Sequence, residues 1–204
     1  LLDSVTVMAK SQVFAAGDDG VVTVGPSGSG ADANTLSAGL TTAAETSAQA
    51  VLLKTGQYAE FNTVETGGLT IRAEDGASPV LEPPEETAGS GTLLSVDAPG
   101  VTVEGLTFEN PIHVLSEENP YPSRAGIGIG SDASGLSVVD NTFQNIGTAD
   151  DAEGNSAGVS GGAGTSDISI VGNTFTDIST GYFDGEYFDW YSAKAIYLSS
   201  NPSG

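Results

Sequence analysis

The chain has 204 residues, which is enough for one domain with a continuous hydrophobic core. Its 27 Asp and Glu against 5 Lys and Arg give a formal net charge of -22 at pH 7, which disfavours nucleic acid and anionic membrane surfaces as partners. The absence of Cys excludes disulfides and thiolate metal sites, and no apolar run approaches the roughly 18 residues of a membrane span.

This acidity indicates a protein adapted to brine. At about 1 M salt the Debye length falls to roughly 3 Å, so surface carboxylates hardly repel one another. An ordinary acidic secreted protein is the alternative interpretation. We therefore expect a halophilic source and an extracellular or virion-surface location in a high-salt environment.

The first thirty residues predict one or two short strands, because valines such as Val5, Val7, Val22 and Val24 alternate loosely between glycines. We assign residues 1–30 to an N-terminal attachment segment. The chain begins at Leu1 rather than Met, which we interpret as the start of a processed or partial chain.

Residues 31–50 predict a single amphipathic helix. Its apolar residues recur at three- and four-residue steps, namely Leu36, Leu40, Ala43, Ala44 and Ala48. Asp32, Asn34 or Thr35 can cap its start. A helix directly ahead of a repeat stack is expected to cap the open edge of the first coil.

Three nearly identical ten-residue segments follow, at 101–110, 136–145 and 168–177, and their starts are 35 and 32 residues apart. Aligned without gaps, they form the columns Val101/Leu136/Ile168, Val103/Val138/Ile170 and Phe108/Phe143/Phe175. Such a period is typical of stacked units that bury their apolar faces against their neighbours. A second strand series of the same period interleaves with the first, at 92–96, 125–129, 157–159 and 193–198. Each coil therefore has at least two faces, and successive coils pair in parallel about 4.8 Å apart.

The decamers, the helix before them, and the entry Val51-Leu-Leu-Lys-Thr-Gly-Gln-Tyr-Ala-Glu60 followed by Gly68-Leu-Thr-Ile71 resemble the right-handed parallel β-helix of the pectin-lyase-like superfamily. The resemblance covers about 31–200. It implies an all-β solenoid with an N-terminal capping helix, in which residues 51–204 form coils that we expect to continue beyond the given chain. It implies little about activity, because the superfamily holds lyases, hydrolases, esterases and non-enzymatic spikes and adhesins.

Polar residues also align in the repeats, as Asn110/Asn145/Asp177 and Asn141/Asn173. A ligand-binding ladder is one interpretation. We favour the other, in which Asn and Asp satisfy backbone groups and adopt left-handed turns at the coil corners, while the Phe column stacks in the core.

Two connections between coils carry polar groups suited to chemistry. In the first, His113 beside Glu117 and Glu118 is a candidate general base or weak metal ligand, and a plain surface residue otherwise. In the second, Asp150, Asp151 and Glu153 offer the hard oxygen ligands that suit Ca²⁺, the one cofactor we consider, although acidic solvated loops are common in this composition.

A third connection, at 181–191, is rich in aromatic residues and holds the single Trp of the chain. Its candidate glycan- or partner-binding residues are Tyr182, Phe183, Tyr187, Phe188, Trp190 and Tyr191. Aromatic faces with interleaved carboxylates suit sugar rings, and Tyr and Trp also anchor protein interfaces. Folding of Phe183 and Phe188 back over the coil is the third alternative.

The catalytic residues of the superfamily's enzymes are not evident. No Gly-His-Gly occurs, Arg72 falls in the earliest strand, and Arg124 lies just ahead of the strand at 125–129. We therefore predict a structural or adhesion module of a surface spike or fibre, from a halophilic virus or an archaeal cell surface. It would belong to a symmetric, trimeric assembly and reach cell-surface glycans or glycoproteins. The alternative is a secreted polysaccharide lyase or glycoside hydrolase of a halophile.

Overall fold

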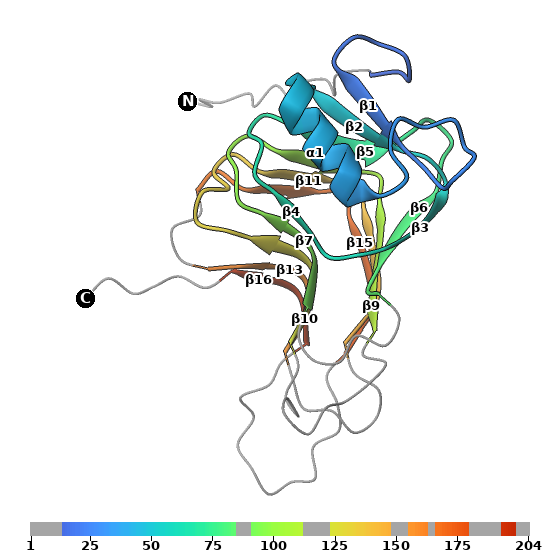
Figure 1. Cartoon of the computed structure of the whole chain (residues 1–204). Coiled ribbons are helices and arrows are strands. Elements are labelled where there is room, and N and C mark those ends of the chain that lie inside the picture. The colour runs from blue at the N-terminus through green and yellow to red at the C-terminus, as the bar shows by residue number, and fades with distance from the viewer. Residues whose placement is uncertain are drawn as a thin grey trace, which may run out of the picture.

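The computed structural model describes residues 14–84, 91–111, 123–147, 155–162, 166–179 and 193–198, which form a right-handed parallel β-helix with one short helix (Figure 1). The elements are β1 (Val21–Val24), α1 (Leu36–Thr46), β2 (Ala50–Leu53), β3 (Gly56–Ala59), β4 (Asn62–Val64), β5 (Thr70–Ala73), β6 (Pro79–Glu82), β7 (Gly91–Val96), β8 (Thr102–Glu104), β9 (Thr107–Pro111), β10 (Arg124–Ile129), β11 (Ser137–Val139), β12 (Thr142–Gly147), β13 (Ser156–Gly161), β14 (Ser169–Val171), β15 (Thr174–Ser179) and β16 (Ala193–Leu198). The predicted fold class is confirmed.

The strands form three parallel sheets, one along each face of the coil. Sheet A has the order β1-β2-β5-β8-β11-β14, sheet B the order β15-β12-β9-β6-β3, and sheet C the order β16-β13-β10-β7-β4. The predicted columns are true strand registers, since Val138 pairs with both Val103 and Ile170, and Phe143 with both Phe108 and Phe175. The expectation of at least two faces is met with three.

The predicted helix is present with narrower bounds, as α1. Thr35 is its N-cap and accepts a hydrogen bond from the Ala38 backbone N–H at 3.2 Å. The Glu60 carboxylate, which follows β3, accepts two more, from the N–H groups of Leu36 at 2.6 Å and Ser37 at 3.0 Å. This carboxylate satisfies donors that the first turn of a helix cannot satisfy itself.

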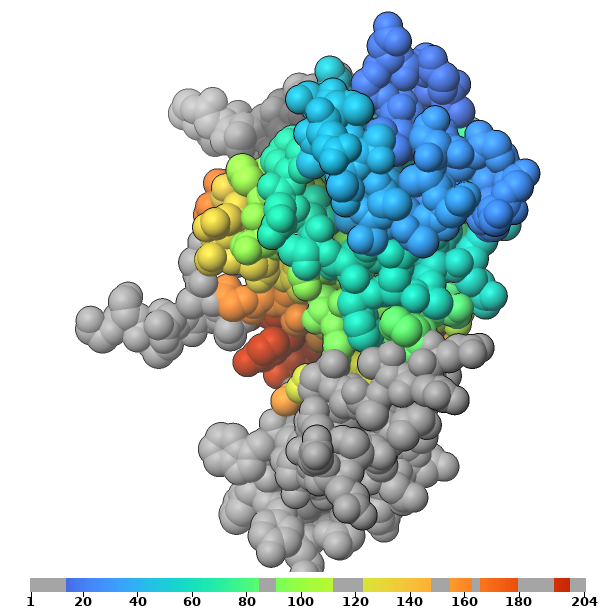
Figure 2. Space-filling view, viewed as in Figure 1, coloured from blue at the N-terminus to red at the C-terminus, as the bar shows by residue number. Residues whose placement is uncertain are grey.

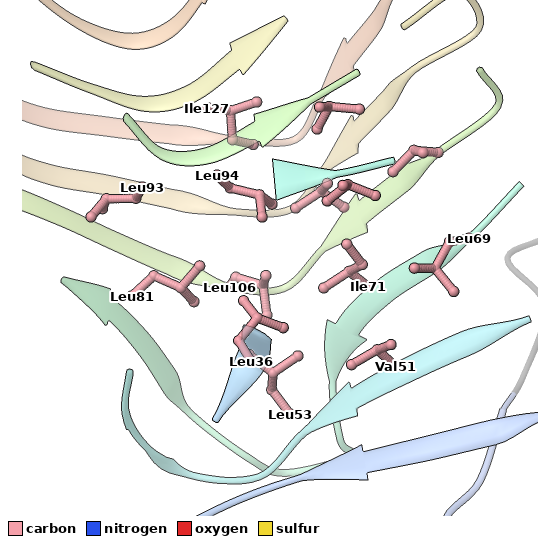
Figure 3. Packing of buried hydrophobic residues seen from close by; sticks show 14 of the residues in the cluster. Leu36, Val51, Leu53, Leu69, Ile71, Leu81, Leu93, Leu94, Leu106 and Ile127 are labelled. Atoms are coloured by element: carbon pink, nitrogen blue, oxygen red, sulfur yellow. The ribbon is translucent and has the colours of Figure 1, made fainter. Parts of the chain in front are cut away.

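The helix lies against the first coils (Figure 1). Gly39 allows a close approach, because a Cβ at this position would lie 2.3 Å from Cγ2 of Val24. Leu36 and Ala43, on the same helix face, are fully buried. Figure 3 shows Leu36 beside Leu53 of β2, so the helix side chains close this end of the core.

The core runs through the stack as columns of like residues. The rings of Phe108, Phe143 and Phe175 stack on one another, with centroids 4.9 Å apart in both pairs and interplanar angles of 10° and 7°. This spacing matches the distance between paired strands, so each ring stays over the ring of the previous coil. The structural interpretation of the Phe column is confirmed.

The aligned polar residues satisfy backbone groups and form turns at the corners of the coils, as the sequence indicates. Asn141 Oδ1 accepts from the Leu106 N–H at 2.9 Å, while its Nδ2 donates to the Val103 carbonyl at 3.0 Å. Asn173 repeats both contacts one coil later, with the Asn141 N–H at 2.9 Å and the Val138 carbonyl at 2.8 Å. Asn145 and Asp177 both adopt a φ of 52°, in the left-handed region that Asn and Asp tolerate.

Candidate functional site

The most distinctive surface in the described part of the chain is the outer face of sheet C. Its strands bend after their third residue, so that Leu93 and Leu94 of β7 both point into the core and are both fully buried. Thr92 and Ser95 consequently both point outward. A Cβ on Gly128 would lie 2.9 Å from Thr92 Cγ2 and 3.8 Å from Ser95 Oγ, which places all three on this outer face.

Two outward columns follow from the strand registers. The first contains Thr92, Ala125, Ala157 and Lys194, and the second contains Thr63, Ser95, Gly128, Ser160 and Tyr197. Most of these side chains are small, so the face is hollowed between its larger members. A hollow of about 370 Å³ is lined by Thr92, Ser123, Arg124, Ala125, Asn155, Ser156, Ala157, Ser160, Lys194 and Tyr197. A second, of about 450 Å³, is lined by Thr63, Ser95, Val96, Asp97, Gly128, Ile129, Gly130, Ser160, Gly161, Gly162 and Tyr197.

The two hollows are neighbours, because Ser160 and Tyr197 line both of them, and we call the two together the sheet C groove. Its floor is backbone and small side chains, and its rim carries hydroxyl and amide groups. Tyr197 is 45% exposed. The ammonium Nζ of Lys194 lies 4.1 Å from the Tyr197 ring centroid, in cation–π contact. One end of the groove thus presents an aromatic surface next to a cation.

Arg124 lines the groove although only 1% of it is exposed. Its Nη1 donates to Asn110 Oδ1 at 3.1 Å, and the Asn110 Nδ2 donates to the carbonyls of Gly91 at 3.0 Å and Ala125 at 2.7 Å. Asn110 therefore ties the first residues of β7 and β10 together and orients the guanidinium. Burial lowers the pKa of Arg124 from its ordinary value.

Gly91 makes room for this arrangement. A Cβ there would lie 2.5 Å from Phe61 Cζ and 3.3 Å from Arg124 Nη1, so both side chains lie over its bare Cα. Ser156, which pairs with Arg124 across the sheet, is buried, and its Oγ has no hydrogen-bond partner in the described residues. The Arg124 guanidinium and the Ser156 hydroxyl thus lie on the sheet B side of these strands, beside Asn110 and Gly147. The groups that the groove presents outward are the Lys194 ammonium, the Tyr197 ring and the hydroxyls of Thr92, Ser95 and Ser160, a set suited to a ligand with anionic and hydroxyl groups.

The site residues predicted from the sequence lie outside the described residues. This holds for the aromatic set Tyr182, Phe183, Tyr187, Phe188, Trp190 and Tyr191, for the acidic set Asp150, Asp151 and Glu153, and for His113, Glu117 and Glu118. These assignments stay predictions. Within the described ranges, no group of three or more His, Cys, Asp or Glu side chains is arranged to hold a metal ion.

Arg72, the other arginine, has a local role. It forms an ion pair with Asp75 and donates through Nε to the Ala73 carbonyl at 3.2 Å, which holds the turn after β5. In the described part of the chain, no helix has the length and hydropathy needed to cross a membrane.

Lys194 and Tyr197 were not identified from the sequence as site residues, and Arg124 was noted only for its position. The strand register would have indicated them, because it aligns Arg124 with Ser156 and places Tyr197 in the column of Ser160. Compared with protein-family models, curated proteins and solved structures, the chain has no match. The evidence for a function therefore comes from the groove and the composition.

Proposed function

We propose that the chain is a non-catalytic adhesion module of a surface spike or fibre, and that it binds an anionic glycan in the sheet C groove. The observation that carries this proposal is the position of Lys194. The chain has only 5 Lys and Arg in a formal net charge of -22, yet the Lys194 ammonium lies 4.1 Å from the exposed Tyr197 ring in the groove. A protein so depleted in cations is not expected to place one beside an exposed aromatic ring in a surface hollow without a use for its charge.

The shape of the groove suits an extended ligand. The column from Thr63 to Tyr197 crosses five strands, which is about 19 Å at the ordinary strand spacing. A short oligosaccharide lying along the stack would place hydroxyls over Ser95 and Ser160, a ring against Tyr197, and a carboxylate or sulfate within reach of Lys194. Hydrogen bonds to serines and stacking on an aromatic ring are the contacts that fix sugars in protein sites.

The proposed setting is the one that the composition favours. A formal net charge of -22 suits a halophilic source and a high-salt location outside the cell or on a virion. We further propose that the module belongs to a larger symmetric assembly and that cell-surface glycans or glycoproteins are its targets.

Isothermal titration of the chain with an oligouronate and with the neutral oligosaccharide of the same linkage tests this proposal. Binding should favour the oligouronate, and Lys194→Ala should weaken it about five- to tenfold, because one charge-assisted contact is lost. Lys54→Ala is the matched control, because Lys54 donates to the Ser29 carbonyl away from the groove and should leave the affinity unchanged. Equal affinities for the two ligands, or equal effects of the two substitutions, would contradict the proposal.

A polysaccharide lyase is the second candidate, and Arg124 is the observation that favours it. Lyases of the superfamily that the sequence resembles use a basic residue, often Arg, to abstract a proton. The near-complete burial of Arg124 and its bond to Asn110 favour a positioning role instead. Ultraviolet absorbance of unsaturated products, measured with acidic polysaccharides in high salt, separates the two candidates. Product formation that is lost in Arg124→Lys would establish the lyase.

A further inference from the structure

The two ends of the sheet C groove carry opposite charges. At the β16 end, the Lys194 ammonium lies over the Tyr197 ring, and Figure 2 shows residues of β16, in red, at the molecular surface. At the other end, the Asp97 carboxylate lines the larger hollow. Among the described residues that line the two hollows, Asp97 is the one with a carboxylate, although the chain has 27 Asp and Glu. The groove is therefore electrically polar along its length.

The strand geometry places the Asp97 side chain on the outer face. Asp97 follows β7 directly and comes two residues after Ser95, whose side chain points outward, so alternation puts both on the same side. The strand pairing continues past β7, since the Gly130 N–H donates to the Val96 carbonyl at 2.7 Å. Asp97 therefore lies beside Gly130 of the next coil, where it is exposed.

A bare glycine in the next coil makes room for the carboxylate. A Cβ on Gly130 would lie 2.3 Å from Asp97 Oδ1 and 2.9 Å from Asp97 Cγ, so the carboxylate lies directly over the Gly130 Cα. Within the described part of the chain, Oδ1 accepts one long hydrogen bond, from the Asp132 N–H at 3.5 Å. Because an ionised carboxylate has about four acceptor positions, most of this acceptor capacity remains available to a ligand in the hollow.

The spacing of the two charges indicates the length of a ligand that would meet both. Asp97 belongs to the coil of β7 and Lys194 to β16, and the strands between them follow the order β7-β10-β13-β16. This separation is about 14 Å along the stack at the ordinary strand spacing. A ligand that meets both charges must therefore span more than one sugar ring.

A uniformly anionic chain does not match this charge pattern. Every ring of an oligouronate carries a carboxylate, so such a chain lying along the groove brings one carboxylate close to Asp97. Like charges placed side by side repel, which disfavours an anionic ring at this end. An ammonium at the same place would be attracted and would donate charge-assisted hydrogen bonds to the Asp97 oxygens.

We infer that Asp97 determines the specificity of the groove by binding an ammonium group of a glycan whose carboxylate or sulfate lies at Lys194. The ligand class is a zwitterionic glycan, in which amino sugars accompany anionic sugars. The two opposite charges fix the direction in which this glycan lies along the stack. The role of Asp97 rests on the proposed function, since it concerns the ligand of the same groove.

Isothermal titration of the whole chain at about pH 6, where carboxylates are ionised and amines are protonated, tests this role. The ligands are a tetrasaccharide in which a uronate alternates with a free-amine hexosamine, its N-acetylated form, and an oligouronate of equal length. The parent chain should bind the amine form about five- to tenfold more tightly than the N-acetylated form, because one charge-assisted contact distinguishes them. Asp97→Asn should remove this preference and strengthen oligouronate binding about two- to threefold, because a repulsion is relieved.

Two further variants separate the possible causes. Lys194→Ala should weaken the binding of all three ligands but keep the preference for the amine, since it removes only the contact with the anionic group. Asp140→Asn is the matched control, because it removes the same charge at the corner between β11 of sheet A and β12 of sheet B. Asp140 has a φ of 52°, in the left-handed region that Asn also tolerates, so this substitution should change none of the affinities.

Circular dichroism establishes that the variants keep their β-structure before the titration. Equal affinities of the parent chain for the amine and N-acetylated forms would overturn the inference alone, as would equal effects of Asp97→Asn and Asp140→Asn. Absence of binding of all three ligands would refute the proposed function and the role of Asp97 together.

Discussion

Asn62 is the residue whose replacement should stabilise the fold. It pairs with Leu94 at the start of β4, so its side chain lies in the inward column that otherwise holds Leu94, Ile127 and Val159. Only 5% of Asn62 is exposed, and within the described part of the chain neither Oδ1 nor Nδ2 has a hydrogen-bond partner. Because the buried carboxamide has given up its hydrogen bonds to water without replacing them, it lowers the free energy of unfolding.

We predict that Asn62→Leu raises the free energy of unfolding by about 2 kcal/mol. Removing the unsatisfied donor and acceptor recovers about 1–3 kcal/mol for each group, and burying the Leu adds a transfer term of about 1.5–3 kcal/mol. A Leu side chain that does not match the shape of the site costs about 1–3 kcal/mol, and the predicted gain of about 2 kcal/mol lies in the lower part of the resulting range. For a chain of this length, the melting temperature should rise by about 4–8 °C.

Urea unfolding followed by circular dichroism, at one fixed salt concentration, measures this change. Asn62→Ala is the second variant: it removes the same polar groups but leaves a cavity, so it should differ little from the parent. If Asn62→Leu lowers the free energy of unfolding by 1 kcal/mol or more while the spectrum is retained, an ordered water satisfies the carboxamide and the reasoning is wrong.

Three further predictions concern the cap of α1, the Asp32 carboxylate and the net charge. Glu60→Gln should lower the free energy of unfolding by about 1 kcal/mol in urea titrations, because it weakens the cap of α1. The control is Glu65→Gln, since Glu65 is exposed. An equal effect of the two substitutions would contradict the capping role of Glu60. Hydrogen bonds from Thr23 lower the pKa of the Asp32 carboxyl; the bond from the backbone N–H is the larger cause and the bond from the hydroxyl the second. The ionised Asp32 therefore stabilises the fold above the unfolded pKa of about 3.9, and this stabilisation is lost as the pH falls through the lower folded pKa. Asp32→Asn should therefore destabilise at pH 7, and the difference should shrink as the pH falls below the unfolded pKa; a pH-independent difference would argue against ionisation as the cause. The urea midpoint should rise as KCl increases from about 0.1 to 1 M, because the Debye length falls from roughly 10 to 3 Å and the carboxylates repel one another less. In acid, where the carboxylates are protonated, the midpoint should hardly change with KCl. An equal rise in acid would assign the effect to salting out.

The columns of the fold could be predicted because they depend on local periodicity. One aliphatic residue recurs at the same position of each coil, as Val103, Val138 and Ile170, and pairs with the equivalent residue of the next coil. An ungapped alignment of the repeats is therefore enough to place these residues. The capping helix was equally accessible, since its apolar spacing and the Thr35 cap lie within one segment. The first two strands of sheet B are different, because β3 and β6 lack the decamer pattern and are fixed by their neighbours in the stack.

The groove could not be predicted because it depends on contacts between coils. The bend that sends both Leu93 and Leu94 inward breaks simple alternation, so the outward positions of Thr92 and Ser95 do not follow from the sequence. The burial of Arg124 requires a bare Gly91 in the preceding coil and the Asn110 amide. The Glu60 contact with α1 spans 24 residues and has no local signal.

Chemical-shift mapping of the isotopically labelled chain during titration with an oligouronate tests the proposed function most directly. In high salt, the largest amide shifts are expected at Ser95, Gly128, Ser160 and Tyr197, which form one column of the sheet C groove. Residues on the outer faces of sheets A and B, such as Ser137 and Thr142, should not shift. Saturable shifts confined to those other faces, or no shifts at ligand concentrations that saturate the calorimetric titration, would contradict the assignment of the groove as the binding site.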